Sequence, residues 1–177
     1  METFTAPKEF IYNPRFGKQR QKSLSDLDLT IIDPPIFDII KTFSMLPFCF
    51  TQQSCYGHFV YEFRQDPKNI EPLPAEAVNS KIEYRLAYIA LCLQNNDQGK
   101  KLFQDLKQIP NIDPDYIQFG SADWFWKQQV NSYALQVEPK RFMTKDSIFI
   151  SYEEALHIEK VRNEFFNEIK MIILRNQ

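Results

Sequence analysis

The sequence predicts a fold of the α/β or α+β class, in which a mixed sheet is flanked by helices. Segments with apolar residues at helical spacing alternate loosely along the chain with short segments that favour strands. Aromatic residues make up 15% of the chain, which holds 16 Phe, so we expect a well-packed core and not a disordered protein. The length of 177 residues suits a single domain over residues 1–177.

A locally basic arm opens the chain over residues 1–22. It carries Lys8, Arg15, Lys18, Arg20 and Lys22 against Glu2 and Glu9. We interpret the arm as a solvated helix face or a loose terminus. The alternative is a local patch that contacts phosphates.

Asp33-Pro34-Pro35 predicts the start of a helix, because Asp33 can act as N-cap and the prolines stand where a missing N–H costs nothing. Its buried face comprises Ile36, Ile39, Ile40 and Phe43, before Pro47 ends the helix. Residues 48–51 and 59–63 favour strands. The second strand should place Phe59, Tyr61 and Phe63 on one side. Between the two strands, residues 52–58 are expected to form a loop or a sharp bend.

The next segments alternate again. Residues 66–80 contain three prolines and predict a Pro-rich connector. We interpret residues 82–93 as one buried strand, because Asn95-Asn96-Asp97 is a good cap for a following helix. The inward positions of that helix, which ends at Pro110, are Leu102, Phe103, Leu106 and Ile109.

The C-terminal part predicts two strands and the clearest helix. Residues 116–119 favour a short strand that turns at Gly120, and residues 124–137 a longer strand with mixed faces. The capping box Ser151-x-x-Glu154 begins the last helix. Its apolar register comprises Ile158, Val161, Phe165, Ile169 and Ile172.

Composition excludes several classes of protein. The formal net charge of -2 argues against a globally basic nucleic-acid binder, and four Gly leave no glycine-rich phosphate loop or dinucleotide fingerprint. Three Cys, an odd number, fit a reducing compartment better than a disulfide framework. The start shows no apolar signal core and the longest apolar run is too short for a membrane span, so we expect a cytoplasmic protein without membrane contact.

Reactive and polar groups concentrate in Ser54-Cys55-Tyr56-Gly57-His58. Gly57 permits a positive φ, and successive N–H groups around such a bend can form an anion nest. Ser54 supplies a hydroxyl, and His58 can carry a proton or a charge near neutral pH. The segment therefore predicts a small binding site.

Two more specific functions of this segment, a catalytic cysteine and a metal site, have less support in the sequence. Cys55 could be a nucleophile beside His58, but the sequence identifies no third group to orient the imidazole, so a structural role is favoured. Cys55-x-x-His58 could be half of a metal site. The other soft or imidazole candidates, Cys49, Cys92 and His157, give no second paired spacing, and no metal site is predicted.

The run Trp124-Phe125-Trp126 could stack on a base or a purine cofactor. In a strand Trp124 and Trp126 share one face, and packing in the core is the favoured interpretation. Asp123, beside the expected turn, could hydrogen-bond a ribose or an amino group, or cap the turn.

The segment Phe50 to His58 resembles the Thr-Ser-Ser-Cys-Ser-Gly-Arg loop of the third-step methyltransferase family of tRNA wybutosine synthesis. Upstream, Ile32-Asp33 is similar to the Ile-Asp that precedes the family's helix, and the resemblance covers about residues 16–60. Tyr56 stands at the family's second Ser and His58 at its Arg, and the family's Asp-Lys-Ser-x-x-Gly element is missing. A histidine cannot reproduce the forked contact of a guanidinium with an anion.

The resemblance implies a divergent member of that family, with an α/β fold and S-adenosylmethionine-dependent methyl transfer to a tricyclic guanosine derivative of a tRNA anticodon loop. The partner is then tRNA, contacted through the local basic patch. The site residues expected on this basis are His58 and Asp33 for catalysis, and Ser54, Cys55, Gly57 and Asp123 for cofactor binding. The alternative, motivated by the departures from the family's pattern, is a non-catalytic RNA- or protein-binding module on the same fold.

Overall fold

The computed structural model describes residues 4–76, 79–142 and 146–177 of the chain. Within these ranges it has five α-helices and eight strands, and the predicted class of mixed helices and strands is confirmed. The helices are α1 (Phe16–Asp26), α2 (Phe37–Met45), α3 (Asp97–Leu106), α4 (Asp123–Gln128) and α5 (Tyr152–Arg175). The strands are β1 (Phe4–Thr5), β2 (Cys49–Cys55), β3 (His58–Val60), β4 (Ile82–Arg85), β5 (Ala87–Leu93), β6 (Ile117–Ala122), β7 (Ser132–Val137) and β8 (Ser147–Ile150).

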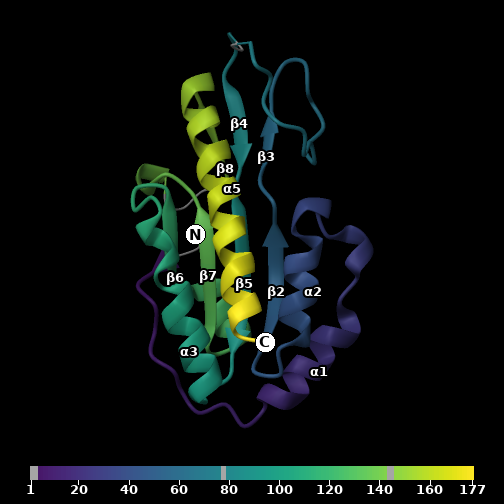
Figure 1. Ribbon diagram of the computed structural model, residues 1–177, viewed down its shortest axis with the longest axis vertical. Helices are drawn as coiled ribbons and strands as arrows, with labels where there is room; N and C mark the ends of the chain where they lie inside the picture. The colour runs from purple at the N-terminus through teal and green to yellow at the C-terminus, as the bar shows by residue number, and fades with distance from the viewer. Residues whose placement is uncertain (1–3, 77–78, 143–145) are drawn as a thin grey trace.

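The strands form two antiparallel sheets in place of the expected mixed sheet. One sheet has the order β1-β6-β7-β5-β2 and the other the order β3-β4-β8, and all the described strand pairs are antiparallel. β2 of the larger sheet leads into β3 of the smaller sheet, and β4 of the smaller sheet leads into β5 of the larger one (Figure 1). The chain therefore crosses between the sheets twice, at two neighbouring places. Cys55 pairs with Tyr88 below this crossing, and His58 pairs with Arg85 above it.

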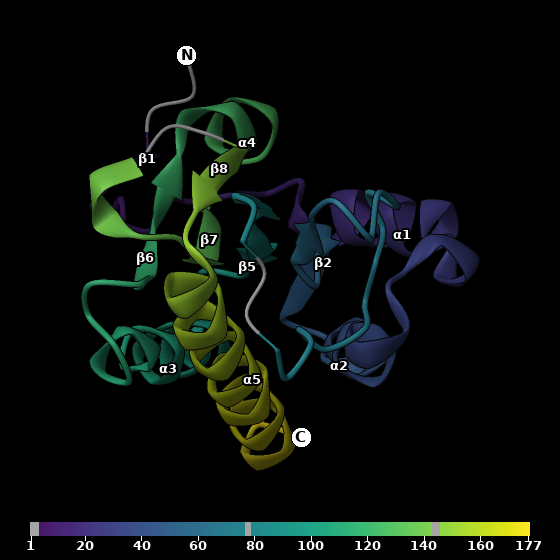
Figure 2. The same ribbon diagram turned by 90° about the horizontal axis from the view of Figure 1, so that it is seen from above.

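Helices cover both faces of the larger sheet. α2, α3 and α5 lie on one face, and α1 and α4 lie on the other (Figure 2). The helical positions expected to face inward on α2, α3 and α5 are all buried, as is Ile109, in one core cluster that also holds residues of both sheets. The buried faces predicted from the apolar periodicity of these three helices are therefore confirmed. None of the helices in the described ranges is long and apolar enough to cross a membrane.

Two of the three predicted helix caps are confirmed. The Ser151 hydroxyl accepts a hydrogen bond from the Glu154 N–H at 3.2 Å, and the Asn96 side chain accepts one from the Gly99 N–H at 2.8 Å. Asp33 is different, because its side chain makes no capping bond to the turn that leads into α2. Its carboxylate turns instead toward the end of β2.

The sequence placed several boundaries wrongly. Residues 52–58 are not a loop, because β2 continues to Cys55 and β3 begins at His58, which leaves a bend of two residues. Phe63 lies beyond β3 and is 81% exposed, so it does not share the buried side of Phe59 and Tyr61. The expected strand over residues 82–93 is two strands that belong to different sheets.

A buried tyrosine explains the break in residues 82–93. The Tyr84 hydroxyl accepts a hydrogen bond from the Ala87 N–H and donates one to the Val137 carbonyl, both at 3.0 Å. Leu86 stands between the two strands, and its N–H donates to the Asp146 carbonyl. Such a side-chain partner satisfies backbone groups at the break, and strand patterning does not reveal it.

The aromatic run was also misassigned. Residues 123–128 form α4, and the strand predicted over residues 124–137 begins only at Ser132. Phe125 is buried against the sheet and Trp124 is 58% exposed, which is the pattern of a helix with one packed face. Gly120 does not turn the chain, because it pairs with Ala134 inside β6. A Cβ there would lie 2.2 Å from the Thr5 carbonyl oxygen, so this glycine permits the close approach of β1.

Candidate functional site

Three segments meet at the crossing between the sheets. They contribute Asp33 from the approach to α2, Cys55 from the end of β2 and His58 from the start of β3. One ligand atom of each, the carboxylate oxygen, Sγ and a ring nitrogen, lies within 4.8 Å of the other two. We call these three residues the corner cluster. Sequence reasoning had proposed all three, but for separate catalytic and cofactor-binding roles.

Gly57 makes the bend that brings Cys55 and His58 together. Its φ is +88°, a backbone conformation that residues other than glycine rarely adopt. A Cβ at this position would lie 2.8 Å from the Ala87 Cβ and 3.0 Å from the Ala87 nitrogen. Close contact with β5 and a positive φ therefore both require glycine here.

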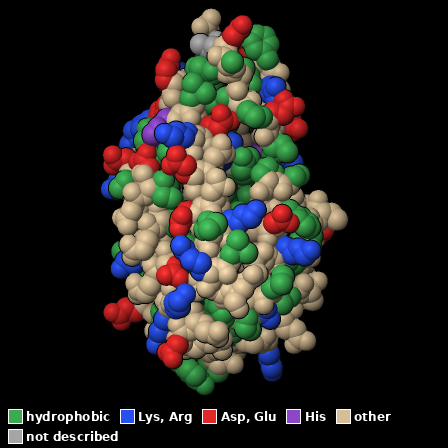
Figure 3. All heavy atoms as spheres, in the orientation of Figure 1, with side chains coloured by type: hydrophobic (Ala, Val, Ile, Leu, Met, Phe, Trp, Pro, Cys, Tyr) green, Lys and Arg blue, Asp and Glu red, His purple; other side chains and the backbone are tan. Residues whose placement is uncertain are grey.

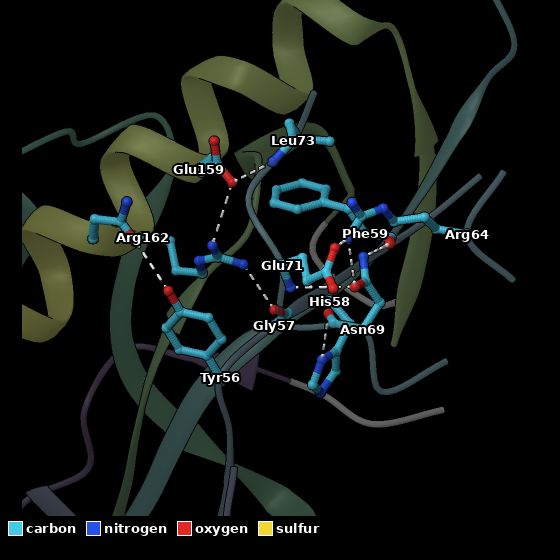
Figure 4. A network of polar contacts seen from close by, with 11 residues as sticks. Tyr56, Gly57, His58, Phe59, Arg64, Asn69, Glu71, Leu73, Glu159 and Arg162 are labelled. Carbon is cyan, nitrogen blue, oxygen red and sulfur yellow. Dashed lines mark hydrogen bonds and ion pairs between the residues drawn. The ribbon is translucent and has the colours of Figure 1, made fainter. Parts of the chain in front are cut away.

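His58 is buried, and both ring nitrogens have partners. Nδ1 lies 3.1 Å from the Asn69 carbonyl oxygen, and Nε2 lies 3.4 Å from Asp33 Oδ2 (Figure 4 shows the first contact). Burial opposes the charged imidazolium, but hydrogen bonds to Asp33 and Cys55 outweigh it and raise the pKa of His58 to about 10. With two acceptors facing its nitrogens, the ring favours the doubly protonated form and offers no free nitrogen to accept a proton.

The backbone N–H groups of the bend are used inside the protein. The Tyr56 N–H donates to Asp33 Oδ2 at 2.8 Å, and the Gly57 N–H donates to Cys55 Sγ at 3.4 Å. Burial opposes the charge of Asp33, but the bonds from His58 and from the Tyr56 N–H outweigh burial and lower the pKa of the carboxyl. The N–H groups of the expected anion nest thus bind the protein's own carboxylate and thiol.

Arg162 of α5 supports the bend from the core side, and sequence reasoning missed it. Its guanidinium donates to the Gly57 carbonyl at 2.8 Å and lies 3.7 Å from Glu159 (Figure 4). It also lies 4.0 Å from the centre of the Tyr56 ring and 5.1 Å from that of Phe59, within the range of cation–π contacts. The sequence does hold one indication of its role. Arg162 directly follows Val161 on the buried side of the helix, and a buried cation needs a specific partner.

A groove of about 700 Å³ opens on the face that carries α1 and α4. Ser54 and Ile32 line it, while Cys55, Gly57, His58 and Asp33 do not. Ser54 and Cys55 are neighbours on β2, but only Ser54 lines the groove, so the groove and the corner cluster are built from different residues. The predicted site residues are thus divided between two places.

Asp123 lies at the start of α4, away from both places. Its carboxylate pairs with Lys8 at 2.8 Å, and it is not among the residues that line the groove. Lys8 also lies 5.2 Å from the centre of a Trp126 ring. Phe125 and Gln128 of α4, and Gln129 directly after it, line the groove instead.

The basic arm is ordered over its described part, and two of its cations have structural partners. Besides the Lys8 pair, Arg20 donates to the carbonyls of Ser44, Leu46 and Cys49 at 2.8 to 3.2 Å, so it binds the end of α2. On the opposite face, which carries α5, Lys and Arg side chains are interspersed with Asp and Glu (Figure 3).

Comparisons with known proteins do not assign a family. No protein-family model matches the chain, and no curated protein matches it. Among solved structures, the chain is similar to the PH1069 protein from Pyrococcus horikoshii, with 12% sequence identity and a TM-score of 0.47. That match covers 92% of this chain and 96% of the other, and a likeness at this level carries no argument about function.

Proposed function

We propose that the chain binds S-adenosylmethionine in the groove between α1, β2 and α4, and transfers its methyl group to a tRNA nucleoside. The observation that carries the proposal is the groove itself. Its volume of about 700 Å³ falls within the range of small-molecule sites, and Ser54 of the family-like motif forms part of its wall.

The chemistry of the groove suits a molecule with a flat base, a ribose and a charged tail. Phe50, Tyr88 and Phe125 contribute aromatic surface. Asp26 and Asp28 supply carboxylates that can accept hydrogen bonds from ribose hydroxyls or attract a cationic sulfonium. Most remaining polar lining groups are side-chain amides and hydroxyls, which can recognise the edge of a base.

Gln52 is the most specific feature of this wall. Its Oε1 is buried and has no hydrogen-bond partner among the described residues. Buried polar atoms nearly always find a partner, so we expect a rotation of the Gln52 side chain to bring this oxygen to an N–H donor of a ligand in the groove, or to a water. An exocyclic amino group of adenine would supply such a donor.

Methyl transfer from a sulfonium depends more on the alignment of donor and acceptor than on a strong base. The proposal therefore does not need His58 to take a proton. Asp33 and His58 act here as positioning residues that fix the end of β2, and with it Ser54. Lys22 of α1 lines the groove, and Lys18 is exposed one turn earlier on the same helix. These two lysines are the candidate contacts for RNA phosphates.

Calorimetric titration with S-adenosylmethionine tests the proposal. We expect binding with one site per chain, and about tenfold weaker binding by Gln52→Met, the effect of one lost hydrogen bond. Gln21→Met is the matched control, because Gln21 is exposed on α1 and does not line the groove. Absence of binding by the unaltered protein at micromolar concentrations would refute the proposal. Binding without methyl transfer to tRNA that carries the tricyclic guanosine derivative would favour the non-catalytic alternative.

A further inference from the structure

We infer that the corner cluster is a transition-metal site, in which Asp33, Cys55 and His58 bind one Zn²⁺ ion. The inference does not depend on the proposed function, because the cluster lies outside the groove. A carboxylate, a thiolate and an imidazole are the three ligand types that Zn²⁺ takes in proteins. Among the described residues, this is the only group of three or more such side chains whose ligand atoms lie this close together.

The distances fit a tetrahedral ion. With Zn–N and Zn–O bonds of about 2.0–2.2 Å, two such ligand atoms stand about 3.4 Å apart in tetrahedral geometry. His58 Nε2 and Asp33 Oδ2 are 3.4 Å apart. Cys55 Sγ lies no more than 4.8 Å from the other two ligand atoms. Closing it onto the ion requires a movement on the order of 1 Å, given a Zn–S bond of about 2.3 Å.

The hydrogen bonds around the cluster are the second, independent observation. A metal-binding histidine usually donates its other ring N–H to a carbonyl or carboxylate, which orients the ring. Nδ1 of His58 faces the Asn69 carbonyl in this way at 3.1 Å, and Nε2 is thereby aimed at the cluster. The Tyr56 N–H supports the carboxylate of Asp33, and the Gly57 N–H supports Cys55 Sγ. Each of the three ligands thus has its own orienting partner.

The site is half-enclosed, with room for a fourth ligand. The side chain of Asp33 is 17% exposed and Cys55 is half-buried, so solvent reaches the cluster, while His58 lies inside at 6%. Three protein ligands with the fourth position open to water is an arrangement that Zn²⁺ adopts in proteins. On binding, protons on the ligand atoms pass to solvent as the metal bonds form.

The ion would join parts of the chain that lie far apart in sequence. Asp33 stands before α2, whereas Cys55 and His58 flank the bend between the two sheets. The Cys-x-x-His spacing is visible in the sequence, but the third ligand is not, because only the fold brings Asp33 to the bend.

Titration of the metal-free protein with Zn²⁺ and with Co²⁺ tests the inference. We expect one ion per chain, and with Co²⁺ a thiolate-to-metal charge-transfer absorption that is absent from Cys55→Ser. Asp33→Asn and Cys55→Ser should each weaken Zn²⁺ binding by more than about 100-fold, beyond what the loss of a hydrogen bond to a ligand costs. The matched control is His157→Gln, because His157 and Asp113 form an exposed pair at 2.8 Å that lacks a thiol. It should bind as the unaltered protein does.

A measurement on the unaltered chain covers the case in which a variant fails to fold. Zn²⁺ should slow the alkylation of Cys55 at least about tenfold, since a metal-bound sulfur is shielded. Three results would each overturn the inference. They are no stoichiometric binding of either ion, binding that survives in folded Cys55→Ser, and an alkylation rate of Cys55 that saturating Zn²⁺ leaves unchanged.

Discussion

Replacing Gly57 by alanine tests the bend that positions both the corner cluster and the end of β2. A residue with a side chain at a φ of +88° costs about 1–3 kcal/mol of backbone strain. The new Cβ would stand 2.8 Å from the Cβ of Ala87 and 3.0 Å from its nitrogen, and overpacking of this kind costs a further 1–3 kcal/mol, as an order of magnitude. We therefore expect the free energy of unfolding to fall by about 2–6 kcal/mol.

Urea denaturation followed by circular dichroism measures this change, and Gly17→Ala is the matched control. Gly17 lies in α1, and a Cβ there would meet nothing within 4 Å. Alanine at that position should raise the free energy of unfolding by about 0.5–1 kcal/mol, because it favours the helix. A Gly57→Ala variant within about 0.5 kcal/mol of the unaltered protein would show that the argument from φ and contact is mistaken.

Three further predictions concern the same region. Arg162→Met should lower the free energy of unfolding by about 1–3 kcal/mol in urea denaturation, because the Gly57 carbonyl loses its donor. Tyr84→Phe should cost a similar amount, about 1–3 kcal/mol, and should speed hydrogen exchange of the Ala87 amide; unchanged exchange would contradict the assigned bond. In the metal-free protein at neutral pH, mass spectrometry should find alkylation only at Cys55, because burial raises the pKa of the other two thiols to about 12.

The sequence was informative wherever one periodic face determined the structure. The faces of α2 and α5 were correct because each helix buries a long apolar stripe, and burial of such a stripe outweighs local preference. The run Trp124-Phe125-Trp126 was misassigned because its residues favour strands in isolation, whereas packing of Phe125 against the sheet stabilises a short helix.

The corner cluster could be predicted only in part. The sequence shows Cys55 and His58 as a spaced pair, and it offers Asp33 as a helix cap and, through the family resemblance, as a site residue. In the structure Asp33 contacts the Tyr56 N–H and His58. These contacts depend on how the two sheets meet, which no local sequence pattern encodes. The Asn69 carbonyl that orients His58 lies in the Pro-rich connector, and Arg162 comes from the far end of the chain.

The hydroxyl of Tyr84 has a mechanical role in how the two sheets are joined. Its two bonds join the first residue of β5 to the last residue of β7, at the point where one sheet gives way to the other. These bonds tie Tyr84 of the small sheet to the paired residues Ala87 and Val137 of the large sheet, so they oppose a rotation of one sheet against the other. Tyr88, the residue after Ala87, lines the groove, so a change in the angle between the sheets would act directly on the groove wall.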